Sequence, residues 1–167
     1  MNRNNIVIFS VVLLGLFGLM WWGRPATSST PSPQSIEESE SILSAPETLY
    51  DFGRISMADG LVNKIFRITN SGAREVELQT ITTSCMCTTA YLIGPRGEAG
   101  PFGMPGHGGA AKSANELIPA GESREIKVVY DPNAHGPAGI GPVDRFIYLE
   151  EKSGGTLALE IKAVVTP

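Results

Sequence analysis

The sequence has little that suits nucleic-acid binding or a conventional active site. Its 167 residues carry a mild net charge of −4, from 13 Lys and Arg against 17 Asp and Glu, and no basic cluster stands out. This charge pattern argues against a nucleic-acid partner. The sequence shows neither a Ser-His-Asp set in a suggestive context nor a phosphate-binding glycine loop before a helix. We therefore expect a binding protein rather than an enzyme, with no nucleic acid among its partners.

Cysteine is also scarce, because Cys85 and Cys87 are the only two in the chain. Aromatic residues are modest in number, and no helix of ordinary length is visible after residue 23. Glycine (19) and proline (12) are instead frequent for this length. This composition favours a loop-rich β fold over a helical bundle. The length allows one domain with a core of its own.

One long apolar run lies near the beginning of the chain. Residues 6–22 (IVIFSVVLLGLFGLMWW) carry no charge, and Arg3 and Arg24 flank them. Seventeen residues is the short end of a membrane span, which needs about 20, and the two tryptophans suit a membrane interface. No small-residue cleavage site follows closely, so we predict an uncleaved signal-anchor helix over residues 1–23. A cleaved signal peptide is the alternative.

After this apolar run, the sequence predicts a tether and then a β-domain. Residues 24–47 are rich in Ser, Thr, Pro and Glu without apolar periodicity, which predicts a disordered tether. The folded domain is expected over residues 48–167, outside the cytoplasm. Alternation or β-branching marks its candidate strands, at 49–55, 64–70, 76–83, 125–130, 145–150 and 156–165. With turn residues between them, six or seven strands predict an all-β sandwich.

A glycine-rich insertion at 92–115 interrupts this pattern. From Gly94 to Gly109 glycine recurs at every third position. Five such triplets inside a β-domain are too few for a collagen triple helix, so we predict a loop with a polyproline-like backbone. The loop carries Met104 and His107. It either folds back and presents these two side chains to the cysteines or remains a solvated loop.

The candidate metal ligands are Cys85, Cys87, Met104 and His107. Thiolate and thioether donors are soft and favour Cu(I) over harder ions. Zinc would also accept two cysteines and one histidine, but it gains little from a thioether. Copper is therefore the candidate ion. His135 is the only other histidine, and we assign it to a turn.

The cysteines also allow interpretations without metal. They can pack as two small buried hydrophobes, or they can pair in an oxidising compartment. In an extended strand, positions i and i+2 lie at the limit of disulfide geometry, so that bond would be strained and easily reduced. Thiol–disulfide chemistry is the weakest hypothesis, because no Lys, Arg or His adjoins the cysteines in sequence and the usual Cys-x-x-Cys spacing is absent.

Five short motifs resemble one bacterial family. They are YDFG at 50–53, FRITNSG at 66–72, TSCMCT at 83–88, IPAGE at 118–122 and YDP at 130–132. In order and spacing they are similar to DUF1573, a family of envelope proteins with an immunoglobulin-like fold akin to ASPM–SPD-2–Hydin domains. The resemblance implies an immunoglobulin-like β-sandwich of about seven strands at an extracytoplasmic site. The chain departs from the family at Met86, where glycine is usual, and in its longer segment 92–115.

Two function hypotheses remain open. The first is a single-pass bacterial membrane protein whose domain, in the periplasm or extracellular space, binds copper as a metallochaperone, sensor or electron carrier. The second is a metal-free interaction or scaffold module with an envelope protein as its partner. The distance of Met104 and His107 from Cys85 separates the two hypotheses.

Overall fold

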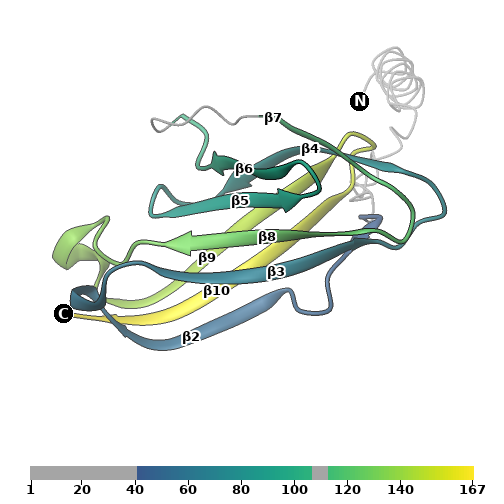
Figure 1. The fold of residues 1–167 in the computed structure, drawn as a ribbon. Coiled ribbons are helices and arrows are strands. Elements are labelled where there is room, and N and C mark those ends of the chain that lie inside the picture. The colour runs from purple at the N-terminus through teal and green to yellow at the C-terminus, as the bar shows by residue number, and fades with distance from the viewer. Residues whose placement is uncertain (1–40, 107–112) are drawn as a thin grey trace, which may run out of the picture. The chain divides into compact units, whose positions relative to one another are not determined.

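The computed structural model describes residues 41–106 and 113–167, which form two packed β-sheets (Figure 1). The first sheet has the order β1 (Leu43–Ser44), β3 (Val62–Asn70), β8 (Ser123–Tyr130), β5 (Thr88–Gly94) and β6 (Gly97–Phe102). The second has the order β2 (Leu49–Ser56), β10 (Thr156–Thr166), β9 (Gly141–Glu151), β4 (Val76–Thr83) and β7 (Ser113–Ile118). The predicted all-β sandwich is confirmed.

The core lies between the sheets and follows from period-two alternation. Along β8, the side chains of Ile126, Val128 and Tyr130 are buried, while the residues between them are only partly covered. Burying an aliphatic side chain of this size contributes about 1.5–3 kcal/mol relative to exposing it. Strands β2 and β10 pair in parallel, whereas the other pairs are antiparallel. The alternating pattern therefore specifies which face of each strand meets the other sheet.

All six strands predicted from the sequence are present; β4 has the expected bounds, and the others differ from theirs by at most four residues. Strands β1, β5, β6 and β7 were not predicted. Strand β1 lies inside the predicted tether, and its Leu43 is 2% exposed. The ordered domain therefore begins before residue 48. The predicted anchor over residues 1–23 and most of the tether lie outside the described residues. Within the described ranges, no helix has the length and hydropathy needed to cross a membrane.

The prediction of a polyproline-like loop is wrong for the first part of the glycine-rich segment. Strands β5 and β6 form a hairpin there, with Gly94 opposite Gly97 and Ala90 opposite Phe102. Gly100 has φ +135°, and a Cβ added to it would lie 3.0 Å from the Ala90 carbonyl oxygen. Glycine therefore lets the edge strand β6 pass close to the backbone of β5. The spacing of the glycines in the sequence does not reveal this role. Residues 107–112 are not described.

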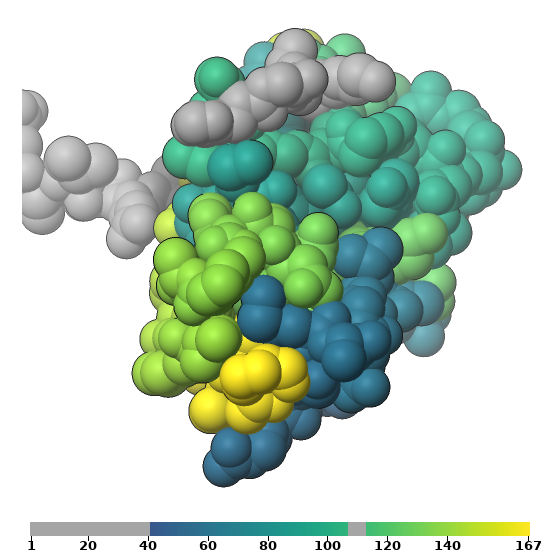
Figure 2. Space-filling model, turned by 90° about the vertical axis from the view of Figure 1, so that its left-hand side faces the viewer, coloured from purple at the N-terminus to yellow at the C-terminus, as the bar shows by residue number. Residues whose placement is uncertain are grey.

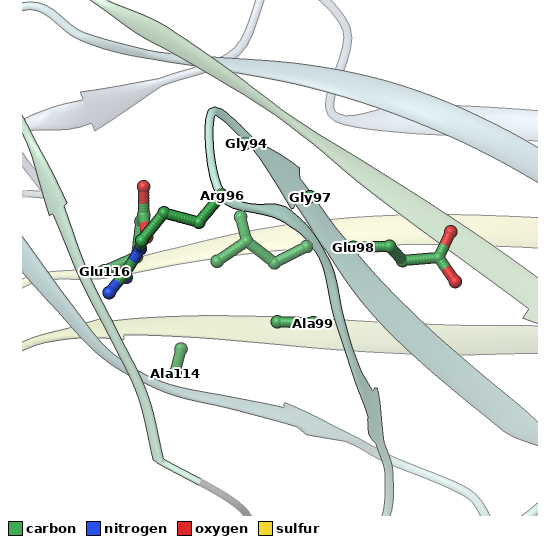
Figure 3. A pocket seen from close by; sticks show the side chains of 8 residues that line it. Gly94, Arg96, Gly97, Glu98, Ala99, Ala114 and Glu116 are labelled. Carbon is green, nitrogen blue, oxygen red and sulfur yellow. The ribbon is translucent and has the colours of Figure 1, made fainter.

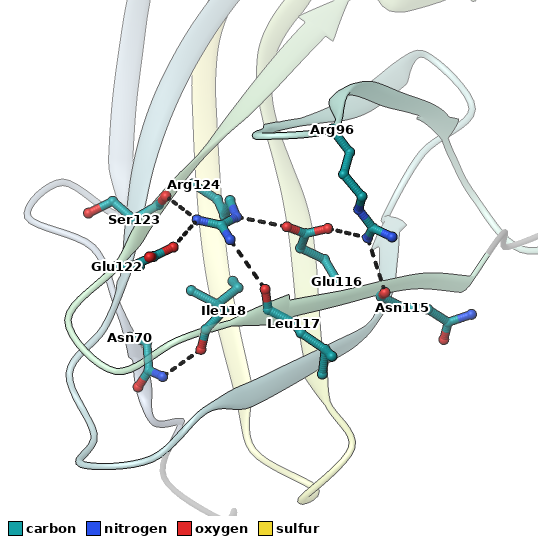
Figure 4. A network of polar contacts seen from close by, with 9 residues as sticks. All are labelled: Asn70, Arg96, Asn115, Glu116, Leu117, Ile118, Glu122, Ser123 and Arg124. Carbon is teal, nitrogen blue, oxygen red and sulfur yellow. Dashed lines mark hydrogen bonds and ion pairs between the residues drawn. The ribbon is translucent and has the colours of Figure 1, made fainter.

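A buried polar network joins the two sheets near β7 (Figure 4). Glu116 on β7 accepts a hydrogen bond from Arg124 Nε on β8 at 2.8 Å, and Arg96 pairs with its other oxygen. Arg124 also donates to Glu122 at 3.0 Å and to the Leu117 carbonyl at 3.2 Å. The Glu116 and Arg124 side chains are only 7% and 6% exposed. Each buried charge therefore has a partner, as burial requires.

The strand register brings several connections to one end of the sandwich. Tyr130, the last residue of β8, lies opposite both Thr88 at the beginning of β5 and Val62 at the beginning of β3. Figure 2 views this end, where the β8–β9 loop (light green) lies beside the short helix η1, Met57–Asp59 (blue). Asn133 Nδ2 donates to the Met57 carbonyl at 2.6 Å and ties the two segments together. The β4–β5 loop with both cysteines belongs to the same end.

Candidate metal and redox centre

The cysteines lie in the tight β4–β5 loop, residues 84–87, rather than in a strand. The Cys85 carbonyl accepts hydrogen bonds from Thr88 N at 3.1 Å and from Thr83 Oγ1 at 3.0 Å. Ser84 bonds to Phe146 of β9 twice, through its backbone N–H and through its hydroxyl oxygen, both at 2.9 Å. Backbone contacts on both sides thus hold the loop in place.

Cys85 and Cys87 form a disulfide, and their Cα atoms are 5.3 Å apart. This separation lies within the ordinary disulfide range of about 4.4–6.8 Å. The expectation of a strained bond assumed an extended strand, whereas the two cysteines lie in a turn, and the strain itself stays a prediction. The two residues differ in exposure, because Cys85 is half-buried while Cys87 is 3% exposed. Met86, between them, is 54% exposed.

His135 completes a three-residue group with the cysteines. Its Nε2 lies 3.2 Å from Cys85 Sγ, and the ligand atoms of all three residues lie within 4.8 Å of one another. His135 directly precedes the short helix η2, Gly136–Gly139, in the β8–β9 loop. The backbone N–H of Asp131 donates to the Cys87 carbonyl at 2.9 Å and holds this loop against the cysteines. His135 does lie in a turn, as expected, but the sequence interpretation missed it as a candidate ligand.

Arg145 approaches the other sulfur. Its Nε donates to Cys87 Sγ at 3.1 Å, and its Nη1 donates to the Asp144 carbonyl at 2.8 Å. The register explains this placement, because Thr83 lies opposite Ile147, so the chain just beyond Thr83 passes Arg145. The statement that no basic residue adjoins the cysteines holds along the sequence but fails in space. Only the register between β4 and β9 would have placed Arg145 beside the cysteines.

The structure leaves the other two predicted ligands open. Met104 is half-buried just after β6, next to Gly103, whose carbonyl accepts a hydrogen bond from Thr83 N at 3.4 Å. This contact brings the backbone beside Met104 close to the strand that leads into Cys85. His107 lies outside the described residues. The ligand roles of Met104 and His107 therefore stay predictions.

A surface hollow of about 300 Å³ lies between the β5–β6 turn and β7 (Figure 3). Residues of that hairpin and of β7 line it: Leu92, Gly94, Arg96, Gly97, Glu98, Ala99, Ala114 and Glu116. The turn is at the opposite end of β5 from the cysteines. At its wall, Arg96 is already paired with Glu116. The lining offers no thiol, imidazole or hydroxyl, so the cysteine loop is the better candidate site.

Comparison with known protein families gives a match that includes the cysteine loop. The family described as "Protein of unknown function (DUF1573)" matches residues 43–96, from β1 to the turn after β5. The resemblance to DUF1573 is confirmed over this segment. The match includes Cys85 and Cys87, whereas His135 and Arg145 lie beyond it. No curated protein matches the sequence.

Solved structures show the same fold. A protein of unknown function from Porphyromonas gingivalis W83 has a TM-score of 0.52 at 19% identity, covering 80% of this chain and 51% of its own. A family 123 glycoside hydrolase from Clostridium perfringens has a TM-score of 0.50 at 8% identity, covering 71% and 22%. The chain thus spans about half of the first protein and about a fifth of the second. The ASH/PapD-like domain 7 of human CEP192 is similar at a TM-score of 0.44 and 14% identity, covering 85% and 96%, and supports no further conclusion.

Proposed function

We propose that the reduced form of the cysteine loop binds one Cu(I) ion through Cys85 and Cys87, with His135 as the third ligand. The observation that carries this proposal is the group of three ligand atoms within 4.8 Å of one another. Two of them are sulfurs, the donors that Cu(I) prefers. Reduction of the disulfide frees both sulfurs as ligands, because a metal binds thiolate.

The softness of the donors and the charge of the site favour Cu(I) over zinc. Zinc also accepts two thiolates and an imidazole, but Cu(I) is the softer ion and gains more from sulfur donors, including the thioether of Met104. Two thiolates and one Cu(I) ion carry a net charge of −1. The guanidinium of Arg145, 3.1 Å from Cys87 Sγ, compensates that charge at a partly buried position. Met104 and His107 are the residues that would add further ligands from the neighbouring loop.

Exposure of the site suits transfer of the ion rather than permanent storage. Cys85 is half-buried and His135 is exposed, so a partner's ligands can reach the ion. The function proposed is therefore that of a metallochaperone and not of an enzyme. Its proposed location is the bacterial cell envelope, with residues 1–23 as a membrane anchor and the domain on the extracytoplasmic side. An envelope protein that accepts copper is the corresponding partner.

The test is Cu(I) titration of the full-length chain in mild detergent, under anaerobic reducing conditions and against a competing Cu(I) chelator. We expect about one equivalent of tightly held copper, and X-ray absorption should show sulfur and nitrogen neighbours. Cys85→Ser and Cys87→Ser should each abolish tight binding, because each removes a thiolate.

Met86→Leu is the matched control, since it changes the loop without touching the three ligand atoms. Its copper affinity should stay close to that of the unchanged protein. Copper retention that is absent, or equal in the cysteine variants and the unchanged protein, would contradict the proposal. A metal-free interaction module would then be the better interpretation of this domain.

A further inference from the structure

The two sulfurs of the disulfide lie in different surroundings. Cys85 Sγ belongs to a half-buried residue and faces the exposed ring of His135 at 3.2 Å. Cys87 Sγ belongs to a residue that is 3% exposed, and it accepts a hydrogen bond from Arg145 Nε at 3.1 Å. The sulfur of Cys85 is therefore accessible to an incoming molecule, whereas the sulfur of Cys87 is buried beside the guanidinium of Arg145. Such a division suits a reactive bond rather than a symmetrical cross-link.

The bond contributes little as a structural staple. It closes a loop with a single residue, Met86, between the cysteines. The stabilisation by a disulfide grows with the length of the loop that it closes. A loop this short therefore stabilises the folded state very little. Backbone hydrogen bonds from Thr88 and Ser84 already fix the turn. A role in chemistry explains the bond better than a role in stability.

We propose that the Cys85–Cys87 disulfide exchanges with thiols of a partner molecule, with Cys85 as the sulfur attacked and Cys87 as the leaving group. The exchange itself needs no metal, and its reduced product is the dithiol form that the proposed copper site requires. It assigns a redox reaction to the two cysteines, for which thiol–disulfide chemistry is the weakest hypothesis from the sequence alone. The co-reactant is a thiol pair, either two small thiols or a dithiol of a protein.

The reaction has two steps, each of which exchanges one S–S bond for another. A partner thiolate first attacks Cys85 Sγ, a mixed disulfide forms, and the electron pair of the broken bond leaves on Cys87 Sγ. A second partner thiolate then attacks the partner's sulfur in the mixed disulfide, and Cys85 leaves as a thiolate. The protein disulfide has gained two electrons, and two partner thiols have become one disulfide. Their two protons pass to solvent or to the new protein thiols.

Each sulfur has a neighbour that suits its part in these steps. Negative charge develops on Cys87 in the first step, where the Arg145 guanidinium already donates a hydrogen bond. Hydrogen bonds to charged partners are about twice as strong as neutral ones, so Arg145 favours departure of this sulfur. In the second step charge develops on Cys85, where His135 can donate from Nε2 in the matching tautomer. Burial of Cys87 protects it from direct attack.

The experiment uses the oxidised full-length chain in detergent, free of metal, with reduced glutathione as the probe. Samples quenched in acid at short times are digested, and tandem mass spectrometry locates the glutathione. We expect a transient mixed disulfide on Cys85. The rate of disulfide loss should fall about tenfold or more in Arg145→Gln, the effect expected for losing one charge-assisted hydrogen bond, and less in Arg145→Lys, which keeps the charge.

Arg54→Gln is the matched control, because Arg54 is exposed on β2, two strands away from β9 in the sheet. Its rate should stay within about twofold of the unchanged protein. Glutathione found on Cys87, or equal rates in Arg145→Gln and Arg54→Gln, would overturn the proposal. The proposal would also be overturned if glutathione left the disulfide of the folded chain intact under conditions in which it reduces the unfolded chain. If Arg145→Gln does not fold, mapping of glutathione on the unchanged chain still decides the attacked sulfur.

Discussion

His135 Nε2 lies 3.2 Å from Cys85 Sγ, although 50 positions separate the two residues in the sequence. The contact joins the β8–β9 loop to the β4–β5 loop at one end of the sandwich. The hydrogen bond from Asp131 N to the Cys87 carbonyl fixes this arrangement near the base of the histidine loop. The backbone therefore holds the histidine loop beside the cysteine loop, and the side chain of His135 makes the contact itself.

The first prediction concerns the two histidines. Replacing His135 with Asn should weaken Cu(I) binding by about tenfold or more, because one nitrogen ligand is lost while both thiolates remain. Competition with a Cu(I) chelator measures the affinity. His107→Asn is the comparison, and a similar loss there would show that both histidines coordinate the ion. An unchanged affinity in His135→Asn would remove His135 from the ligand set.

The second prediction concerns Met104. Met104→Leu keeps a side chain of similar volume but removes the thioether, so it separates ligation from packing. We expect Cu(I) affinity to fall several-fold while the free energy of unfolding changes by about 0.5 kcal/mol or less. Chelator competition and urea unfolding of the apoprotein measure the two quantities. A large loss of stability with unchanged affinity would show that Met104 serves packing alone.

How far the sequence predicts this fold depends on each strand's burial pattern. In residues 123–130 buried side chains alternate with partly or fully exposed ones, and this strand is predicted from the sequence within two residues. The segment 97–102 instead has one buried side chain, Phe102, after two glycines, an alanine, a proline and one charged residue, Glu98. Alternation is invisible there, because an edge strand with one buried contact needs little hydrophobic pattern.

Only those residues of the candidate site that are close together in the sequence could be predicted to lie together. Cys85 and Cys87 are neighbours in sequence, so their pairing could be considered from spacing alone. His135 and Arg145 approach them through the loop between β8 and β9 and through the register of β9 against β4. Register is a property of paired strands and cannot be read from one segment. The sequence-based argument that no basic residue adjoins the cysteines therefore does not hold in space.

The third prediction concerns Asn70, which is fully buried. Its Nδ2 donates to the carbonyl oxygens of Ile118 and Arg74, both at 2.8 Å, and its Oδ1 accepts from Gly72 N at 2.9 Å. Asn70→Ala should destabilise the domain by about 2–4 kcal/mol, because buried backbone groups lose their partners. Urea unfolding measures the loss. Asn63→Ala, exposed on the same strand, should change stability by about 0.5 kcal/mol or less.

The fourth prediction concerns the pH dependence of the Glu116 network. Burial raises the pKa of Glu116, but hydrogen bonds from Arg124 and Arg96, together with their charges, outweigh burial and leave the pKa below its ordinary value. A carboxyl with a lower pKa in the folded state binds fewer protons there than in the unfolded chain. Its contribution to stability is therefore fully present above the unfolded pKa of about 4.3 and is lost as the pH falls below it.

Glu116→Gln tests this prediction, because the amide keeps the shape of the side chain but cannot pair as an anion. At pH 7 the variant should lose about 2–4 kcal/mol, since Arg124 is left buried with a weaker partner. Its stability should then fall less steeply than that of the unchanged protein between about pH 4.5 and pH 3. Urea unfolding across that range gives both quantities. Glu125→Gln, at an exposed position of β8, should keep the original pH profile, and a parallel profile in Glu116→Gln would mean that other carboxyl groups cause the acid sensitivity.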